Sequence, residues 1–298
     1  MNHFKKIYIL ILLPFGEFLF SQIGVVTLFR NEANYLKEWI EYHHMIGVDH
    51  FILYNDRSDD DWEVVLDPYI KSKLVTVIDW PCPPMVPVFP GWQVSAYKDG
   101  IKRFKGRKEW VAFIDIDEFI LPLKNANIQD CLQQYFSHAS GIYLQWINFG
   151  TSFKTINPKS PILFELTRAS PKLHSFNASG KSIVRLEDVD VDLCWSPHFL
   201  SLHKQKKYYD GGGNFQPMTD NNLKSIIKHD SDIIRINHYY FRDERFFHER
   251  RLKNHLSGLT GELPLIMERY HSFNLEKNCE IKRFIKRHHR SKINFWER

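Results

Sequence analysis

The chain has only four cysteines among its 298 residues, and no two of them are spaced as Cys-x-x-Cys. This scarcity fits neither a zinc site nor a compact disulfide framework, so we expect buried free thiols. The chain also has no evident internal repeat and no nucleic-acid-binding motif, so nucleic acid is not an expected partner. Its 43% hydrophobic and 25% charged residues exclude wholesale disorder and are typical of a globular protein.

Long apolar runs are rare as well, and the amino-terminal one is broken. Lys5 and Lys6 precede the run Ile7–Leu13, which resembles the charged and apolar parts of a signal peptide. Glu17 interrupts the apolar stretch, which is too short for a membrane span. We interpret residues 1–22 as a signal-like or anchor segment, with a buried extension as the alternative. An exported or membrane-associated location is therefore favoured over a cytoplasmic one.

The carboxyl-terminal end of the chain is basic. Lys282 to Arg298 contain seven basic residues and one acid. Such a segment suits an anionic partner, for example phosphate or a membrane surface. The solvated face of an amphipathic helix explains the same pattern. We predict a basic helical extension over residues 261–298, with membrane-surface association as one interpretation of its charge.

Between these two ends, segments typical of strands alternate with segments typical of helices. The predicted strands of the first half cover residues 23–29, 49–55, 73–79 and a run leading into Asp115, and the helices start near Asn31 and Gln93. This alternation predicts an α/β protein with a Rossmann-like, mostly parallel sheet flanked by helices. The less periodic second half has extended stretches at 141–147, 181–185 and 233–240 and a charged helix at 243–256. One domain over residues 23–260, with an elaborated carboxyl half, is the simplest organisation.

The apolar run after Glu109 ends abruptly in three carboxylates, those of Asp115, Asp117 and Glu118. In an extended segment, Asp115 and Asp117 would share one face. Two carboxylates about 4 Å apart repel by roughly 4 kcal/mol at an effective dielectric constant near 20. A divalent cation reverses that repulsion, and Mg²⁺ and Mn²⁺ prefer oxygen ligands and substrate phosphates. The pattern indicates a metal–diphosphate site, with a solvated acidic turn as the alternative.

Other polar residues follow the ends of the predicted parallel strands. Phe29–Glu32 come after the first strand and Asn55–Asp56 after the second, as Asp115–Asp117 do after the fourth. In such sheets, ligands bind beyond the carboxyl ends of the strands. These three groups are therefore expected to converge on one ligand.

Several short motifs together resemble those of glycosyltransferases of family 92 and their bacterial, family 2-like relatives. The motifs are Phe29–Glu32, Glu38–His43, Gly47–Phe51, Tyr54–Asp56 and Trp110–Phe119, followed more thinly by Trp146, Phe149–Ser152, Lys181–Ile183 and Asn237–Tyr239. The combination of these motifs is specific, whereas any single motif is weak evidence for the family. It covers residues 23 to 245 and leaves out both ends of the chain.

The resemblance implies a GT-A fold that binds a nucleotide-sugar donor, expected to be UDP-linked, with Mn²⁺ or Mg²⁺ as cofactor. It implies transfer of the sugar, expected to be inverting, to a glycan or other hydroxyl acceptor. Asp115 and Asp117 match the Asp-x-Asp signature of the family, and His238 matches a histidine that completes the metal site. A hydrogen-bonded histidine on a partly buried strand is the alternative role for His238.

The resemblance also places residues around the nucleotide. Arg30, Asn31 and Asp56 are expected near the nucleoside, and Asp115 near the metal, the ribose or both. Lys181 and Arg185 share one face of a predicted strand, which suits contacts with diphosphate oxygens. A helix cap, a turn hydrogen bond and a solvated basic face are the alternative roles for these residues.

An inverting transfer also needs a base that takes the proton of the acceptor hydroxyl. The sequence does not choose among the candidates for this role, which are Glu118, Glu187, Asp188 and Asp190. Glu118 is ranked low because it would point to the face opposite Asp117, and Glu187 or Asp188 is taken as the working assignment. His43 and His44 lack the His-Glu-x-x-His spacing of zinc proteases, so one of them is expected to be a hydrogen-bonded core histidine.

Two other functions are consistent with parts of the sequence. One is a non-catalytic, GT-A-like protein that binds a glycan or a nucleotide. The other is a Mg²⁺-dependent aspartyl phosphohydrolase of the haloacid-dehalogenase type, which also places Asp-x-Asp after an apolar strand. Those enzymes usually carry Thr or Val two residues after the second Asp, where this chain has Phe119.

The exported location and the transferase function conflict with each other. A signal peptide would remove a transferase from the cytosolic nucleotide-sugar that it needs.

Overall fold

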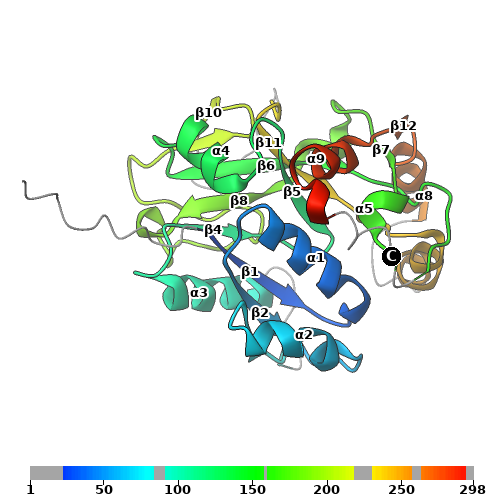
Figure 1. Cartoon of the computed structure of the whole chain (residues 1–298), viewed down its shortest axis with the longest axis horizontal. Helices are drawn as coiled ribbons and strands as arrows, with labels where there is room; N and C mark the ends of the chain where they lie inside the picture. Colours follow the sequence, from blue (N-terminus) through cyan, green and yellow to red (C-terminus); the bar gives the residue numbers. More distant parts are fainter. Residues whose placement is uncertain (1–22, 84–90, 158–159, 218–229, 257–262, 293–298) are drawn as a thin grey trace, which may run out of the picture.

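The computed structural model describes residues 23–83, 91–157, 160–217, 230–256 and 263–292. Its first half alternates strands and helices (Figure 1). The elements are β1 (Ile23–Phe29), α1 (Ala33–Met45), β2 (His50–Asn55), α2 (Trp62–Lys71), β3 (Val75–Asp79), α3 (Gln93–Phe104) and β4 (Trp110–Phe113). The four strands are parallel, in the order β3-β2-β1-β4. Their carboxyl ends therefore lie at one edge of the sheet.

The second half extends this sheet with mixed strand directions. Its strands are β5 (Glu118–Pro122), β6 (Gly141–Asn148), β7 (Arg168–Ala169), β8 (Gly180–Arg185), β9 (Tyr208–Asp210), β10 (Phe215–Gln216), β11 (Ile234–His238) and β12 (Glu276–Lys277). Strand β8 lies antiparallel between β4 and β6. Strand β11 pairs antiparallel with β5 and parallel with β6, so it brings His238 beside the segment that follows β4.

The helices of the second half lie around that mixed sheet. They are α4 (Ile128–Tyr135), α5 (Ile162–Glu165), α6 (Glu244–Phe246), a π-helical turn η4 (Phe247–Leu252), α7 (Lys253–Leu256), α8 (Leu263–Ser272) and α9 (Glu280–His288), with 3₁₀ turns η2 (Ser175–Ala178), η3 (Leu186–Asp188) and η5 (Arg290–Lys292). No helix among the described residues is long and apolar enough to cross a membrane. The predicted segment 1–22 lies outside the described residues.

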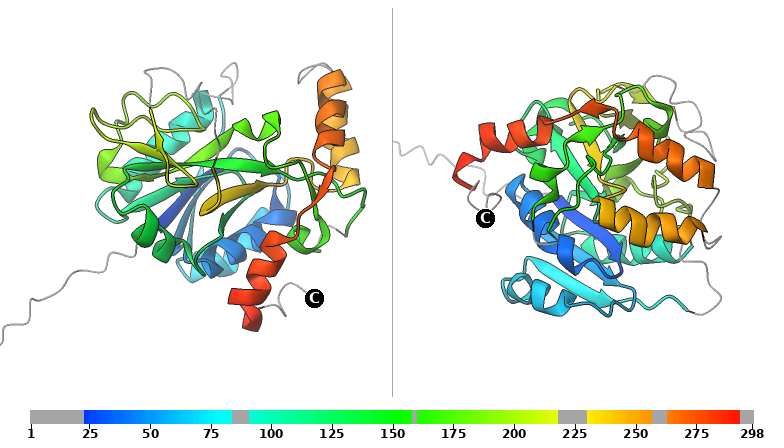
Figure 2. Two further views of the ribbon diagram at one scale, coloured as in Figure 1. Left: turned by 90° about the horizontal axis from the view of Figure 1, so that it is seen from above. Right: turned by 90° about the vertical axis from the view of Figure 1, so that its right-hand side faces the viewer.

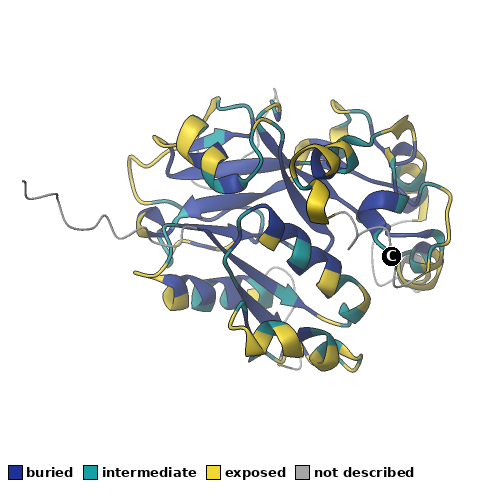
Figure 3. Cartoon of the chain, in the orientation of Figure 1, coloured by how far each residue is buried: buried dark blue, intermediate teal, exposed yellow. Residues whose placement is uncertain are grey.

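Alternate side chains of β1 enter two separate cores, because successive residues of a strand point to opposite faces. Val25 packs in the cluster that holds Trp39 of α1, and Val26 packs in the cluster that holds Tyr97 of α3. Helices α1 and α2 accordingly lie on one face of the sheet and α3 on the other (Figure 2). Buried residues concentrate along the strands, and exposed residues on the outer sides of the helices (Figure 3).

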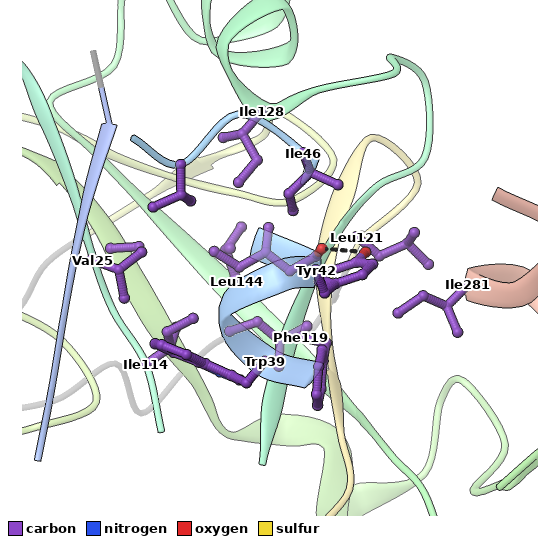
Figure 4. Close-up of a cluster of buried hydrophobic side chains, with 14 of the residues drawn as sticks. Val25, Trp39, Tyr42, Ile46, Ile114, Phe119, Leu121, Ile128, Leu144 and Ile281 are labelled. Carbon is purple, nitrogen blue, oxygen red and sulfur yellow. Dashed lines mark hydrogen bonds between the residues drawn. The ribbon is translucent and has the colours of Figure 1, made fainter. Parts of the chain in front are cut away.

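Helix α1 is anchored to β5 by polar groups on its buried face. Trp39 Nε1 donates to the carbonyl oxygen of Glu118 over 2.9 Å, and the Tyr42 hydroxyl donates to that of Ile120 over 2.8 Å (Figure 4). His43 bridges the same two elements, since Nδ1 contacts the Trp39 carbonyl at 2.8 Å and Nε2 accepts from the Ile120 amide at 3.2 Å. The predicted core histidine is therefore His43.

The predicted α/β fold, with a mostly parallel first half flanked by helices, is confirmed. The carboxyl-terminal extension is more closely integrated than the sequence predicted. Ile281, Phe284 and Ile285 of α9 are buried in the same core cluster as Trp39, and β12 pairs with β7. Residues 263–292 are therefore packed against the main body, and the proposed boundary at residue 260 stays a prediction.

Candidate functional site

The Asp115–Asp117 segment forms a turn between β4 and β5. Strand β4 ends at Phe113, and the Glu118 amide donates to the Asp115 carbonyl oxygen over 3.1 Å. The chain is therefore not extended here, and the alternation that would place both aspartates on one face does not apply. Each carboxylate instead contacts its own set of partners.

Asp115 is held by residues of α3 and β8. Its Oδ2 lies 2.9 Å from Lys181 Nζ, and its Oδ1 accepts from Gln93 Nε2 over 2.7 Å. Lys181 is 1% exposed. Its burial tends to lower the pKa, but Asp115, Tyr97 and Glu118 together raise the pKa above the ordinary value. Lys181 is thus a buried cation that neutralises Asp115.

Asp117 faces β11 and η4. Its Oδ1 lies 3.7 Å from His238 Nε2, and its Oδ2 lies 3.3 Å from Arg251 Nη2. Burial tends to raise the pKa of Asp117, but the neighbouring His238, Arg242 and Arg251 hold it below the ordinary value. Asp117 is therefore an anion at neutral pH, with one oxygen directed at an imidazole and the other at a guanidinium.

Asn148 at the end of β6 fixes the orientation of the His238 ring. Asn148 Nδ2 donates to the Phe176 carbonyl oxygen over 2.8 Å and to Asn177 Oδ1 over 2.9 Å. The Asn148 amide oxygen, 2.8 Å from His238 Nδ1, is then the acceptor of an Nδ1 proton. In the neutral ring, Nε2 carries a lone pair that faces Asp117. Metal-binding histidines are oriented by second hydrogen bonds of this kind.

A small basic pocket adjoins Asp117. Its volume is about 190 Å³, and it is lined by Arg30, Glu32, Phe246, Arg250, Arg251 and Asn254. The buried Arg242 donates to Glu32 over 2.9 Å and stacks on Tyr35 at 3.8 Å from the ring centroid. Three arginines around one pocket favour an anionic ligand with several oxygen atoms.

Arg250 and Arg251 are site residues that the sequence did not reveal. They belong to a segment recognised only as a charged amphipathic helix. Arg251 reaches Asp117 because η4 follows β11 closely in the fold, and its guanidinium stacks on Tyr240 at 4.0 Å from the ring centroid. No spacing rule identifies such residues before β11 is placed beside β5.

The three residues predicted near the nucleoside lie at the carboxyl ends of β1 and β2, where the sequence placed them. Arg30 lines the basic pocket. Asn31 Oδ1 accepts from the Asp59 amide over 2.9 Å, and Asp56 Oδ1 accepts from the Cys82 amide over 2.8 Å. The side chains of Asn31 and Asp56 thus hold the loops, which agrees with the alternative turn role, and their contact with a nucleotide stays a prediction.

Arg185, Glu187 and Asp188 lie at the opposite end of the strands from Asp115. The pairing of β8 with β4 sets Arg185 opposite Trp110, the first residue of β4, and Ser182 opposite Phe113, the last. Arg185 forms an ion pair with Glu109. Asp188 of η3 pairs with Lys206 at 2.6 Å, and Glu187 of the same turn is exposed. This placement does not favour their predicted contacts with a diphosphate or an acceptor, and those roles stay predictions.

The carboxylate and imidazole groups of this site suit a divalent cation that is held by few protein ligands. Within the described ranges, no group of three or more His, Cys, Asp or Glu side chains is arranged to hold a metal ion. Asp115 contacts Lys181 and Gln93 in this structure, so the predicted ligand set of Asp115, Asp117 and His238 stays a prediction. Asp117, in the turn before β5, and His238, at the end of β11, are a carboxylate and an imidazole that face each other. Mg²⁺ commonly binds to one or two carboxylates and completes its coordination with substrate phosphates and water.

Comparison with known sequences covers most of this region. Residues 23–257 match the sequence profile of Glycosyltransferase family 92. The chain belongs to glycosyltransferase family 92.

Its relatives include plant proteins of that family. A family 92 protein of Oryza sativa subsp. japonica is 33% identical over 196 residues, which is 63% of this chain and 31% of the relative. One of Ricinus communis is 26% identical over 238 residues, 77% of this chain and 37% of the relative. The family 92 chain thus spans about a third of the length of these curated relatives.

Solved structures with a similar chain path include those of two bacterial proteins. S. aureus TarS in complex with UDP-GlcNAc gives a TM-score of 0.39 at 13% identity, over 92% of this chain and 73% of TarS. Glucosyl-3-phosphoglycerate synthase from Mycobacterium tuberculosis, in complex with Mn²⁺, UDP and glucosyl-3-phosphoglycerate, gives 0.33 at 20% identity, over 56% of this chain and 58% of the synthase. At these low scores, neither similarity supports an argument about the site.

Proposed function

We propose that this family 92 chain transfers a sugar from a nucleotide-sugar, expected to be UDP-linked, to a hydroxyl group of a glycan or similar acceptor. The reaction is proposed to depend on Mn²⁺ or Mg²⁺ and to invert the anomeric carbon. The observation that supports this proposal best is the Asp117–His238 pair beside a pocket of three arginines. Family membership indicates the same class of reaction.

Asp117 and His238 are the residues proposed to hold the cation. A cation held there would supply positive charge to offset the negative charge that develops on the diphosphate as the sugar leaves. The neighbouring Asn148 keeps the lone pair of His238 Nε2 directed at Asp117, so the two donors are oriented before the cation binds. Protein side chains that are already oriented for a cation need no rearrangement when the cation binds.

The arginines of the basic pocket are proposed to bind the diphosphate. Arg251 already contacts Asp117. In the proposed complex, its guanidinium lies between Asp117, the metal ligand, and the diphosphate. Arg30 and Arg250 line the same pocket and supply further donors. A guanidinium suits this role because it can donate two parallel hydrogen bonds to phosphate oxygens.

Lys181 and Asp115 are proposed to position α3 and β8 around the site. Lys181 and Gln93 both contact the Asp115 carboxylate. In this role Asp115 organises the turn that presents Asp117, and it is also proposed to contact the ribose directly. Removing the Asp115 carboxylate would be costly, since it would leave Lys181 as an unpaired buried charge.

Thermal unfolding with a panel of nucleotide-sugars, each with and without Mn²⁺, tests the proposal. We expect a UDP-sugar to raise the melting temperature only when Mn²⁺ is present, and UDP to be released on incubation. Stabilisation without any release of UDP, whatever the donor and acceptor, indicates a non-catalytic binding protein. If no nucleotide stabilises the protein, the proposed function is wrong.

A further inference from the structure

A second cavity lies at the other end of β5 from Asp117. We name it the α9 cavity; its volume is about 450 Å³, and it is lined by Leu123, Lys124, Asp232, Glu280, Arg283, Phe284, Arg287 and His288. Asp117 precedes the first residue of β5, and Leu123 follows its last. A five-residue strand spans about 17 Å at 3.4 Å per residue. One small ligand therefore cannot occupy both sites.

The α9 cavity carries an excess of positive charge. Its two acidic residues are already paired, Asp232 with Lys172 and Glu280 with the buried Arg235. In the part of the chain that the structure describes, the cations Lys124, Arg283 and Arg287 form no ion pair with a carboxylate. The pKa of Asp232 is lowered by Lys172, and Lys124 helps to lower it through an electrostatic interaction with that carboxyl group. The three cations thus present donors to one space without a direct ion pair among the described residues. Guanidinium groups in such an arrangement match the oxygen atoms of a phosphate.

The walls of the α9 cavity are fixed by contacts between separate elements. The Leu123 amide donates to the Ile233 carbonyl oxygen over 2.8 Å. His289 Nε2 lies 2.9 Å from the carbonyl oxygen of Ala126, which holds the loop after β5 against the end of α9. Phe284 is 6% exposed and belongs to the main core. The cations Lys124, Arg283 and Arg287 are exposed, but they extend from a packed helix and a tethered loop.

We propose that the α9 cavity binds the phosphate group of an anionic ligand. Two sources share this chemistry, the phosphodiester of an anionic lipid headgroup and a free phosphate or pyrophosphate ion. The proposal goes beyond sugar transfer and does not depend on it, since none of the cavity residues contacts Asp117 or His238 in the described structure.

Two double variants of the full chain test the proposal. Arg283→Ala with Arg287→Ala removes two cations from the cavity. Lys286→Ala with Arg290→Ala removes the same charge from exposed positions of the same segment outside the cavity, and is the matched control. Lys124→Ala removes a cation from a different element, in case the first pair affects α9. Melting temperatures confirm that each variant folds.

Binding is measured with two probes, inorganic pyrophosphate by calorimetry and vesicles of phosphatidylglycerol by co-sedimentation, with phosphatidylcholine vesicles as reference. We expect the cavity variants to bind at least one probe roughly tenfold more weakly, because charge-assisted hydrogen bonds are lost, and the control to bind within twofold of the wild type. An effect on vesicles alone identifies a lipid source, and an effect on pyrophosphate alone a free ion. Equal weakening in the cavity variants and the control, or no binding of either probe by the wild type, overturns the proposal.

Discussion

The site depends on a few side chains whose orientations are set by their neighbours. Asp117 meets His238 and Arg251, and Asn148 turns the His238 ring so that Nε2 faces the carboxylate. Asp115 belongs to the same short motif but contacts Lys181. Two aspartates that are equivalent in sequence thus have different electrostatic environments, and we expect them to respond differently to substitution.

Replacing Asp117 by Asn removes the negative charge while keeping the size of the side chain. We expect metal-dependent release of UDP to fall by about 10²–10³, the range found when one preorganised charge-stabilising group is lost. Steady-state release of UDP against Mn²⁺ concentration measures the effect. The melting temperature without Mn²⁺ is the control for folding. Unchanged turnover would remove Asp117 from the metal site.

Replacing Asn148 by Ala removes the acceptor that orients His238. Loss of such an outer partner typically weakens metal affinity by about 10–100-fold, so the Mn²⁺ concentration needed for half-maximal activity should rise by that factor. Asn148→Asp keeps an acceptor oxygen for Nδ1 but loses the donor to Phe176 and Asn177, so it should restore only part of the affinity. An equal loss in both variants would show that Asn148 acts through folding rather than through the ring of His238.

At the scale of elements, close contact between α3 and β1 decides how the helix lies on the sheet. A Cβ atom at Gly100 of α3 would lie 2.8 Å from both Val26 methyl groups, and one at Gly24 of β1 would lie 2.7 Å from the Phe104 ring. The helix can approach the strand only because both positions lack a side chain. This approach carries Gln93, at the start of α3, to Asp115.

Gly100→Ala should destabilise the protein in spite of the better helix propensity of alanine. Overpacking a buried contact costs about 1–3 kcal/mol, whereas Gly to Ala in a helix gains at most about 1 kcal/mol. Urea unfolding at neutral pH measures the difference. Gly91→Ala is the control, since its Cβ meets nothing within 4 Å. Equal stability of both variants would contradict the proposed packing constraint.

At the scale of the molecule, the sheet has a hydrophobic core on each face. Strand β5 joins its parallel first half to the second half, in which the strand directions are mixed. His43 contributes to that connection by bridging α1 and β5 with both ring nitrogens. Burial lowers its pKa from 6.5 to about 3. The neutral ring is thus favoured in the folded state, and protonation favours the unfolded state.

The free energy of unfolding should therefore fall as the pH drops below 6.5, the ordinary pKa of His43. A lowered folded-state pKa gives stability that is present above the unfolded-state pKa and lost as pH falls toward the folded-state value. Between pH 6.5 and 4.5 this amounts to about 2 kcal/mol. His43→Gln cannot titrate and should lose less over this interval in urea unfolding. Identical pH dependence in both proteins would contradict the predicted role of His43.

Local patterns in the sequence were sufficient to predict the elements of the first half and the acidic motif after β4. The predicted strand over residues 23–29 matches β1, and the helix predicted to start near Gln93 matches α3. Strands buried on both faces and amphipathic helices produce periodic patterns within a short window of sequence. Such signals are local, so they can be read without knowing the fold.

Which polar side chains contact one another depends on the tertiary structure. The antiparallel register of β8 places Lys181 beside Asp115 and Arg185 at the far end of β4. From the sequence, both were predicted to contact the same diphosphate. The turn at Asp117 directs its carboxylate at His238 and Arg251. Strand register and chain reversal depend on contacts between segments far apart in the sequence, which no short window contains.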